Sequence, residues 1–378
     1  MQLRCNVHVK LFISPMNVTF ADKLARMPHY DAGMHPADAK TAFGADNAIK
    51  LASNESAWPP HSAVVEAVAR AAAEANRYPD QHARELRRRI AERYDGDPAR
   101  VAVGNGSCEI LLAAAEALCE PGSELVYAWP AFSIYPHLGA LSGAREIRVP
   151  LDDGYVHDLD AILTEITAAT QLVLICNPNN PTGTYLPAER IGAFVDRVPG
   201  HVTVILDEAY IEFQVADDPE ATLGLLRDHP NLVCLRTFSK CYGLAGMRVG
   251  YALCSAQFRA AVDAVRQPFS VNGLAQAAAA EAILHQDDVI RRIERTVTER
   301  LWVEEELHEL GLTTAETQAN FSWVALGERD ETEVVESLGR SGVIVRPGGA
   351  LGGPGHIRVT HGTRTENEAF IEALRSAL

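Results

Sequence analysis

Short apolar segments alternate with helical segments through the middle of the chain, and this alternation constrains the fold more than any other feature. Apolar runs predict strands at 101–103, 124–128, 144–149, 172–176, 202–206 and 232–236, and helical spacing predicts helices at 108–119, 131–141, 158–168 and 187–198. Such alternation is typical of a mainly parallel sheet with helices on both faces. The sequence therefore predicts an α/β fold.

The pattern changes after about residue 270. A long helical stretch at 272–309 precedes shorter strand-like segments near 321–326, 343–346 and 357–360. A chain of 378 residues is long enough for two domains. We predict a large α/β domain at 51–270 and a smaller α+β domain at 271–378, with residues 1–50 as an N-terminal extension and arm that packs with the small domain.

Composition excludes several classes of function. The net charge of −16 argues against a nucleic-acid partner. No run approaches the ~20 apolar residues of a membrane helix, so we expect no membrane partner. The seven cysteines form no disulfide framework and no cluster with metal-ligand spacing, which indicates reduced thiols, a cytoplasmic location and no bound metal.

Lysine is rare in this chain. Only five of the 34 basic residues are lysines, at positions 10, 23, 40, 50 and 240. Lys240 stands alone in the last 328 residues of an otherwise arginine-rich sequence. A primary amine forms a Schiff base with an aldehyde, whereas a guanidinium group does not. The alternative is that Lys240 is an ordinary surface lysine.

Polar residues follow the predicted strands, at the edge where open α/β sheets bind ligands. Gly106 and Ser107 lead into the helix predicted to begin at Cys108, whose N-terminal N–H groups favour a phosphate; the alternative is a plain glycine turn. Asn177 opens a loop, 177–183, that two prolines and a glycine make rigid, so it could present a fixed hydrogen-bond donor or form a simple turn.

Two further groups of residues suit a charged ligand. Asp207 ends a buried strand, where a carboxylate needs a cationic partner unless it caps a helix. Ser239, Lys240 and Arg248 share one glycine-punctuated loop, 237–250, and together suit a molecule that carries both a phosphate and an aldehyde.

These segments resemble the fold type I pyridoxal-phosphate aminotransferases of class I and II, and in particular the histidinol-phosphate aminotransferase group. The resemblance extends from about Pro28 to the C-terminus and includes the segments 51–55, 76–79, 265–269 and 357–360. It implies an enzyme that binds pyridoxal 5'-phosphate, acts as a homodimer with shared active sites, and transfers an amino group from an amino donor to a 2-oxo acid.

The resemblance also implies roles for individual residues. Lys240 would form the Schiff base and move the proton, Asp207 would pair with the pyridine nitrogen, and Tyr210 and Asn177 would bind the phenolic oxygen. The remaining cofactor-binding positions would be Gly106, Ser107, Cys108, Phe132, Ser239, Arg248 and, from the other subunit, Tyr78. Arg358 would hold the substrate carboxylate, with Tyr30, Asn54 and Arg346 also near the substrate.

Each of the less specific positions has a plainer interpretation. Phe132 could be core, Tyr78 and Tyr30 could pack locally, and Arg358 could lie on the surface. The chain also departs from the group at Cys108, where an aspartate is usual, and at Trp58, in a loop near the substrate.

The first interpretation of function is transamination between histidinol phosphate and 2-oxoglutarate by a ping-pong mechanism. Tyr30 favours this substrate pair, because relatives have a tyrosine near the substrate phosphate. An aromatic amino acid aminotransferase is the nearest alternative. A decarboxylase of a phosphorylated amino acid is a more distant one.

Overall fold

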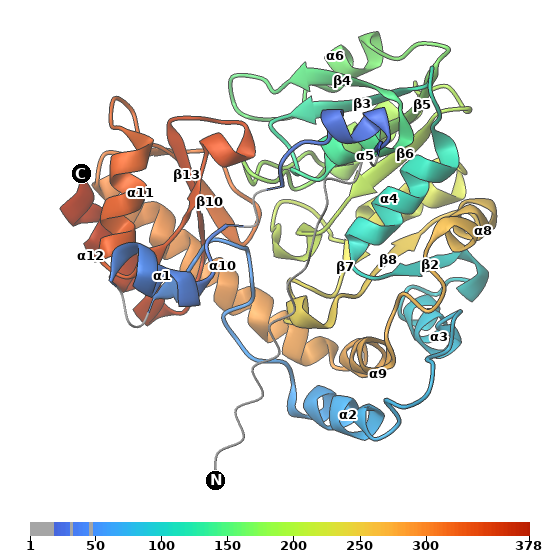
Figure 1. Cartoon of the computed structure of the whole chain (residues 1–378), viewed down its shortest axis with the longest axis horizontal. Helices are drawn as coiled ribbons and strands as arrows, with labels where there is room; N and C mark the ends of the chain where they lie inside the picture. Colours follow the sequence, from blue (N-terminus) through green and yellow to red (C-terminus); the bar gives the residue numbers. More distant parts are fainter. Residues whose placement is uncertain (1–18, 31–32, 45–47) are drawn as a thin grey trace.

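The computed structural model describes residues 19–30, 33–44 and 48–378, which form a large and a small domain (Figure 1). The large domain is built on a seven-stranded sheet in the order β2-β8-β7-β6-β5-β3-β4. Its strands are β2 (Val101–Gly104), β3 (Glu124–Trp129), β4 (Arg145–Pro150), β5 (Thr170–Cys176), β6 (Thr203–Asp207), β7 (Leu232–Thr237) and β8 (Gly250–Leu253). All neighbours pair in parallel except β8, which is antiparallel to both β2 and β7. The predicted α/β fold is confirmed.

Helices cover both faces of this sheet because the strands are apolar on both sides. On one face, α4 (Ser107–Leu118), α5 (Tyr135–Ser142) and α8 (Ala256–Val265) pack in one core with the sheet. On the other, α6 (Leu159–Thr164) and α7 (Ala188–Val195) form a second core. Helices α2 (Ser62–Ala72), α3 (Arg84–Arg93) and α9 (Gly273–Ala282) pack together at the β2 edge.

The small domain contains a four-stranded antiparallel sheet and several helices. The sheet has the order β12-β13-β10-β9, and a separate parallel pair joins β1 to β11. The strands are β1 (Ile49–Lys50), β9 (Thr313–Thr314), β10 (Phe321–Ala325), β11 (Val343–Ile344), β12 (Arg346–Pro347) and β13 (His356–Thr360), and the helices are α1 (Pro36–Phe43), α10 (Gln286–Glu309), α11 (Glu331–Arg340) and α12 (Arg364–Ala377).

Several elements differ from the sequence prediction. The helical stretch at 272–309 is two helices, and the first of them, α9, packs in the large-domain core instead of the small-domain core. The N-terminal arm also divides: α1 contacts α11 of the small domain, whereas the short helix Asp22–Arg26 contacts α5 of the large domain. Apolar packing places α9, whereas a hydrogen bond from Lys23 Nζ to the carbonyl oxygen of Leu141 links the short helix to α5. The local sequence reveals neither contact.

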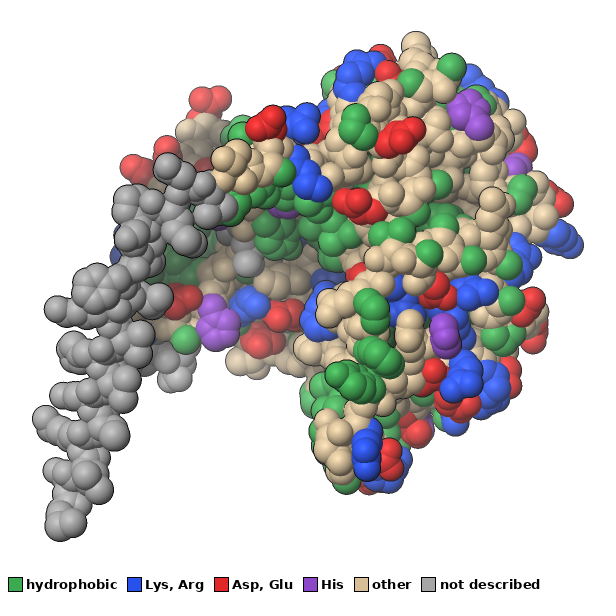
Figure 2. Space-filling view, turned by 45° about the vertical axis from the view of Figure 1, so that its right-hand side comes forward, with side chains coloured by type: hydrophobic (Ala, Val, Ile, Leu, Met, Phe, Trp, Pro, Cys, Tyr) green, Lys and Arg blue, Asp and Glu red, His purple; other side chains and the backbone are tan. Residues whose placement is uncertain are grey.

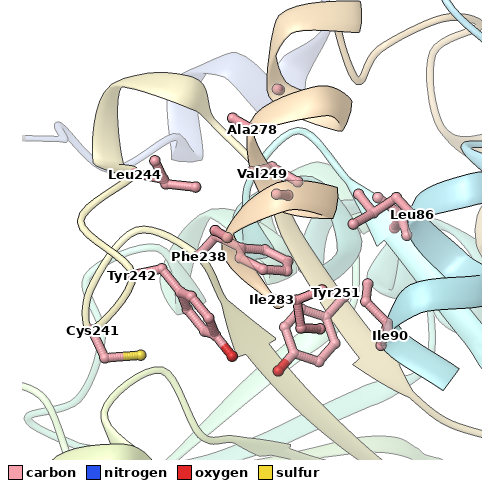
Figure 3. Packing of buried hydrophobic residues seen from close by; sticks show 14 of the residues in the cluster. Leu86, Ile90, Phe238, Cys241, Tyr242, Leu244, Val249, Tyr251, Ala278 and Ile283 are labelled. Carbon is pink, nitrogen blue, oxygen red and sulfur yellow. The ribbon is translucent and has the colours of Figure 1, made fainter. Parts of the chain in front are cut away.

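A dense apolar cluster lies beneath the loop that carries Lys240. Phe238, Cys241, Tyr242 and Leu244 point into it and meet Leu86, Ile90, Val249, Tyr251, Ala278 and Ile283 from neighbouring elements (Figure 3). The ring of Phe238 packs against the rings of Tyr242 and Tyr251. The residues on both sides of Lys240 are therefore fixed by burial, so the position of its backbone is determined by the core.

No helix in the described ranges is long and apolar enough to cross a membrane.

Candidate active site

A cavity of about 370 Å³ lies between the two domains, at the carboxyl ends of β5, β6 and β7. Figure 2 shows a hollow between the domains with hydrophobic side chains along its walls. The cavity brings together most of the residues that the sequence singles out: Tyr30, Asn54, Ser107, Cys108, Phe132, Asp207, Tyr210, Ser239, Lys240, Arg248, Arg346 and Arg358. Segments far apart in the chain thus share one site.

The amine of Lys240 projects into this cavity from a buried loop. Its Nζ donates hydrogen bonds to the backbone carbonyl oxygens of Ser53, at 3.2 Å, and Asn54, at 3.1 Å. Burial, together with the positive charge of Arg358, lowers the pKa of Lys240 from about 10.5 to about 7. A substantial fraction of this amine is therefore neutral, and nucleophilic, near neutral pH.

Asp207 ends β6 and is almost completely buried at the floor of the cavity. The Tyr135 hydroxyl donates a 3.0 Å hydrogen bond to one carboxylate oxygen, Oδ2. The other oxygen, Oδ1, is buried and has no partner among the described residues. Burial raises the pKa of Asp207 to about 6. A protonated ring nitrogen would give Oδ1 the cationic partner that such a buried carboxylate requires.

An anion-binding cradle lies at the start of α4. Gly106 precedes the helix, and no side chain caps its first N–H groups. The Arg248 guanidinium lies directly against Gly106, since a Cβ atom at Gly106 would be 2.5 Å from Arg248 Nη2. Arg248 Nη1 also lies 3.5 Å from the Ser239 hydroxyl. Open N–H groups, a hydroxyl and a guanidinium form a suitable site for a phosphate.

Tyr210 is placed by Asn54. The Asn54 side-chain amide donates a 3.0 Å hydrogen bond to the Tyr210 hydroxyl, and burial raises the pKa of Tyr210 above its usual range. Thr360 fixes Asn54 in turn, because its hydroxyl donates to Asn54 Oδ1 and accepts from the Asn54 backbone N–H. The hydroxyl of Tyr210 is thus held neutral, as a hydrogen-bonding group at the cavity wall.

Asn177 does not occupy the position that the sequence predicts for it. Its side chain exchanges two hydrogen bonds with the backbone of Leu186, at 2.7 and 2.8 Å, and it does not line the cavity. Asn180, three residues later in the same loop, lines the cavity and accepts a hydrogen bond from Arg358. Asn177 therefore holds the loop in shape, and Asn180 is the asparagine that faces the site.

Two arginines reach the cavity from neighbouring strands of the small domain. Arg346 of β12 pairs in register with Arg358 of β13, and both side chains are buried. Arg358 also donates to the carbonyl oxygen of Ala52 at 2.8 Å. Burial and the nearby Arg346 lower the pKa of Arg358 to about 10. Two guanidinium groups at one wall create a site for a carboxylate.

The remaining predicted residues lie at the margins of the site or outside it. Tyr30 lines the cavity, with its ring edge-on to His137 at 5.8 Å between centroids. Phe132 lines it as well. Tyr78 is 83% exposed, stacks on Phe269 and does not line the cavity of its own chain. Trp58 is also absent from the lining, and its carbonyl oxygen accepts a hydrogen bond from Arg292.

The structure also shows site residues that were not predicted from the sequence. Tyr135 is one, although its position three residues after Phe132 was a usable indication. Lys50 is another, because it lines the same cavity and forms a 3.0 Å ion pair with Glu55. Leu351, in a glycine-rich loop, adds an apolar side chain to the wall.

The residues that line this cavity are suited to bind pyridoxal phosphate. The unpaired oxygen of Asp207 suits the ring nitrogen, the N–H groups at Ser107 suit the phosphate, and the Lys240 amine, with its lowered pKa, suits the aldehyde. In the described ranges, no group of three histidine, cysteine or acidic side chains could hold a metal ion.

Comparisons with known proteins show the family of the chain. The family model described as aminotransferase class I and II matches residues 46–374. An aromatic amino acid aminotransferase from Thermobifida fusca (strain YX) is 45% identical over 332 residues, covering 86% of this chain and 89% of the relative. One from Mycobacterium sp. (strain JLS) is 39% identical over 368 residues, covering 96% and 99%.

Solved structures show the same fold. The histidinol-phosphate aminotransferase from Sinorhizobium meliloti, in complex with pyridoxal-5'-phosphate, superposes with a TM-score of 0.86 at 28% identity. The superposition covers 95% of this chain and 97% of that one.

Proposed function

Because the chain belongs to the class I and II aminotransferase family and is a pyridoxal-phosphate-dependent aminotransferase, we propose that its amino donors are aromatic amino acids, with 2-oxoglutarate as the acceptor. The relatives named aromatic amino acid aminotransferases are 39–45% identical to this chain, whereas the solved histidinol-phosphate aminotransferase from Sinorhizobium meliloti is 28% identical. These identities favour the aromatic alternative over histidinol phosphate.

One observation carries the proposed chemistry: the amine of Lys240 and the carboxylate of Asp207 face the same cavity as two buried arginines. When bound, pyridoxal phosphate supplies an aldehyde that takes up the amino group and a ring that withdraws electrons from the substrate Cα. Asp207 would keep the ring nitrogen charged. Lys240 Nζ would accept the proton from Cα, and Arg358 would hold the α-carboxylate.

The two arginines would also influence which substrate bond is broken. Arg358 and Lys240 line the same cavity, so a carboxylate bound by Arg358 would leave the Cα–H bond, rather than the bond to the carboxylate, free to point at Lys240. This arrangement favours transfer of the amino group over decarboxylation. A decarboxylase is therefore the weaker alternative.

We further propose a homodimer in which Tyr78 completes the partner's site. Tyr78 is exposed and lies outside its own cavity, yet a second aromatic ring, Phe269, holds it in place at 4.7 Å. An ordered and exposed tyrosine of this kind is well suited to contact a second copy of the chain.

The proposed substrates are tested by comparing kcat/KM for phenylalanine, tyrosine and histidinol phosphate, each with 2-oxoglutarate, on the purified holoenzyme. We expect phenylalanine and tyrosine to exceed histidinol phosphate by about a hundredfold or more. A higher kcat/KM for histidinol phosphate would contradict the aromatic assignment while leaving the aminotransferase chemistry intact.

A further inference from the structure

Leu351 is an apolar side chain fixed at a wall that is otherwise rich in polar groups. It lies in the loop 348–355, which joins β12 to β13, the two strands that carry Arg346 and Arg358. The side chain is only 3% exposed, but it lines the cavity, and Trp323 and Ala315 pack behind it. The arginines that are suited to bind a carboxylate, Arg346 and Arg358, are thus followed in the same cavity by the apolar side chain of Leu351.

The loop that carries Leu351 has little freedom to move. Glu331 accepts hydrogen bonds from the backbone N–H groups of Gly349, at 3.0 Å, and Gly355, at 2.7 Å. A Cβ atom at Gly352 would lie 2.5 Å from Trp129 Nε1, so the loop also lies tightly against the large domain. Contacts on both sides therefore fix the loop, and Leu351 is presented to the cavity as a rigid surface.

Other apolar surfaces of the cavity come from different parts of the chain. Tyr30 belongs to the N-terminal arm and Phe132 to the large domain, whereas Leu351 belongs to the small domain. The side chain of an amino acid whose carboxylate is bound by Arg358 can reach these surfaces from within the same cavity. Only Leu351 shares a hairpin with the arginines, so its distance from the bound carboxylate is set by that hairpin.

On this basis, which rests on the proposed function, we infer that Leu351 is a specificity-determining residue that packs against the aromatic ring of the amino donor. A flat aromatic side chain buries a large apolar area against such a surface. A leucine side chain cannot donate a hydrogen bond, so a charged or strongly polar donor side chain placed against it would lose hydration without compensation.

The test compares two amino donors of different reach in the single-turnover half-reaction of the holoenzyme. Phenylalanine extends to Leu351, whereas alanine ends at its Cβ. We expect Leu351→Ala to lower kcat/KM for phenylalanine by about tenfold or more and to leave the value for alanine within about twofold. Leu351→Met, which conserves volume, should retain most of the activity with phenylalanine.

A matched control separates recognition from stability. Leu312→Ala truncates another almost fully buried leucine of the small domain, one that does not line the cavity. Leu312→Ala should leave unchanged the ratio of kcat/KM for phenylalanine to kcat/KM for alanine. Failure of the wild-type enzyme to convert phenylalanine would contradict the proposed function. If the wild-type enzyme converts phenylalanine and Leu351→Ala leaves the ratio unchanged, the inference about Leu351 alone is overturned.

Discussion

At the scale of single residues, the site depends on two buried ionisable groups whose pKa values move toward each other. Burial raises the pKa of Asp207 to about 6 and, with Arg358, lowers that of Lys240 to about 7. In both groups burial disfavours the charged form, as expected for groups removed from water. Bound pyridoxal phosphate would relieve both costs, because it offers a cation to the carboxylate and an aldehyde to the amine.

The pKa of Lys240 predicts how the apoenzyme takes up its cofactor. Only the neutral amine attacks an aldehyde, and its fraction increases with pH until the pH exceeds the pKa. The rate of reconstitution should therefore rise about tenfold between roughly pH 6 and pH 8 and then level off. Stopped-flow absorbance with pyridoxal phosphate measures this rate. A rate that continued to rise toward pH 10 would indicate an ordinary lysine.

Tyr135 should lower the pKa of the Asp207 carboxylate to which it donates a hydrogen bond. Its hydrogen bond lowers the pKa of Asp207, so Tyr135→Phe should raise that pKa and move the acidic limb of the activity profile up by about one pH unit. Tyr127→Phe is a matched control, since that buried tyrosine donates to Glu146 and does not line the cavity. Equal profiles for the two variants would show that Tyr135 has only a packing role.

The sequence and the structure differ most instructively at Asn177. Residues 177–183 contain two Asn-Pro pairs, and both asparagines are buried. Local sequence cannot tell which of them faces a ligand, because that depends on a contact with Leu186 and on Arg358, which is 178 residues away from Asn180. The chemistry of the loop was predictable, but the choice of asparagine was not.

At the scale of elements, the phosphate cradle depends on β8, a strand that the sequence does not predict. Its segment, Gly250–Leu253, is short and follows a glycine-rich loop, so it carries little periodic pattern. The strand nevertheless lies between β2 and β7 and brings Gly250 against the start of α4. A Cβ atom at Gly250 would lie 2.4 Å from Ser107 N.

Gly250→Ala should therefore distort the phosphate-binding site at the start of α4. Strand β8 and the start of α4 would have to separate, so we expect weaker binding of pyridoxal phosphate and a free energy of unfolding lower by about 1–3 kcal/mol. Cofactor titration and thermal unfolding measure the two effects. Gly200→Ala is the control, because no atom lies within 4 Å of a Cβ atom there. Equal cofactor affinity in both variants would contradict the importance of this contact.

At the scale of the whole molecule, the alternation of strands and helices was sufficient to predict the large domain. It was not sufficient to predict which of the flanking segments pack with that domain. Helix α9 joins the large-domain core, and the N-terminal arm divides between the domains. These placements arise from contacts between segments that are distant in sequence, which periodicity does not encode. The site itself was more predictable, because its chemistry is concentrated at strand ends.

The proposed dimer predicts complementation between two defective variants. Lys240→Ala removes the amine from its own site, and Tyr78→Ala removes the tyrosine from the partner's site. A mixed dimer would contain one site with both native residues, so mixing should restore activity to about a quarter of the wild-type value after random reassociation. Turnover of phenylalanine measures the recovery. Activity no greater than that of the separate variants would contradict a shared site.

The central claim is that Lys240 is the lysine that bonds to the cofactor, and covalent labelling tests it most directly. Lys50 lines the same cavity, which makes it a real competitor. Reduction of the holoenzyme with borohydride, followed by peptide mass spectrometry, should place the phosphopyridoxyl group on Lys240 alone, and Lys240→Arg should carry none. A label on Lys50, or an unchanged label in Lys240→Arg, would contradict the account.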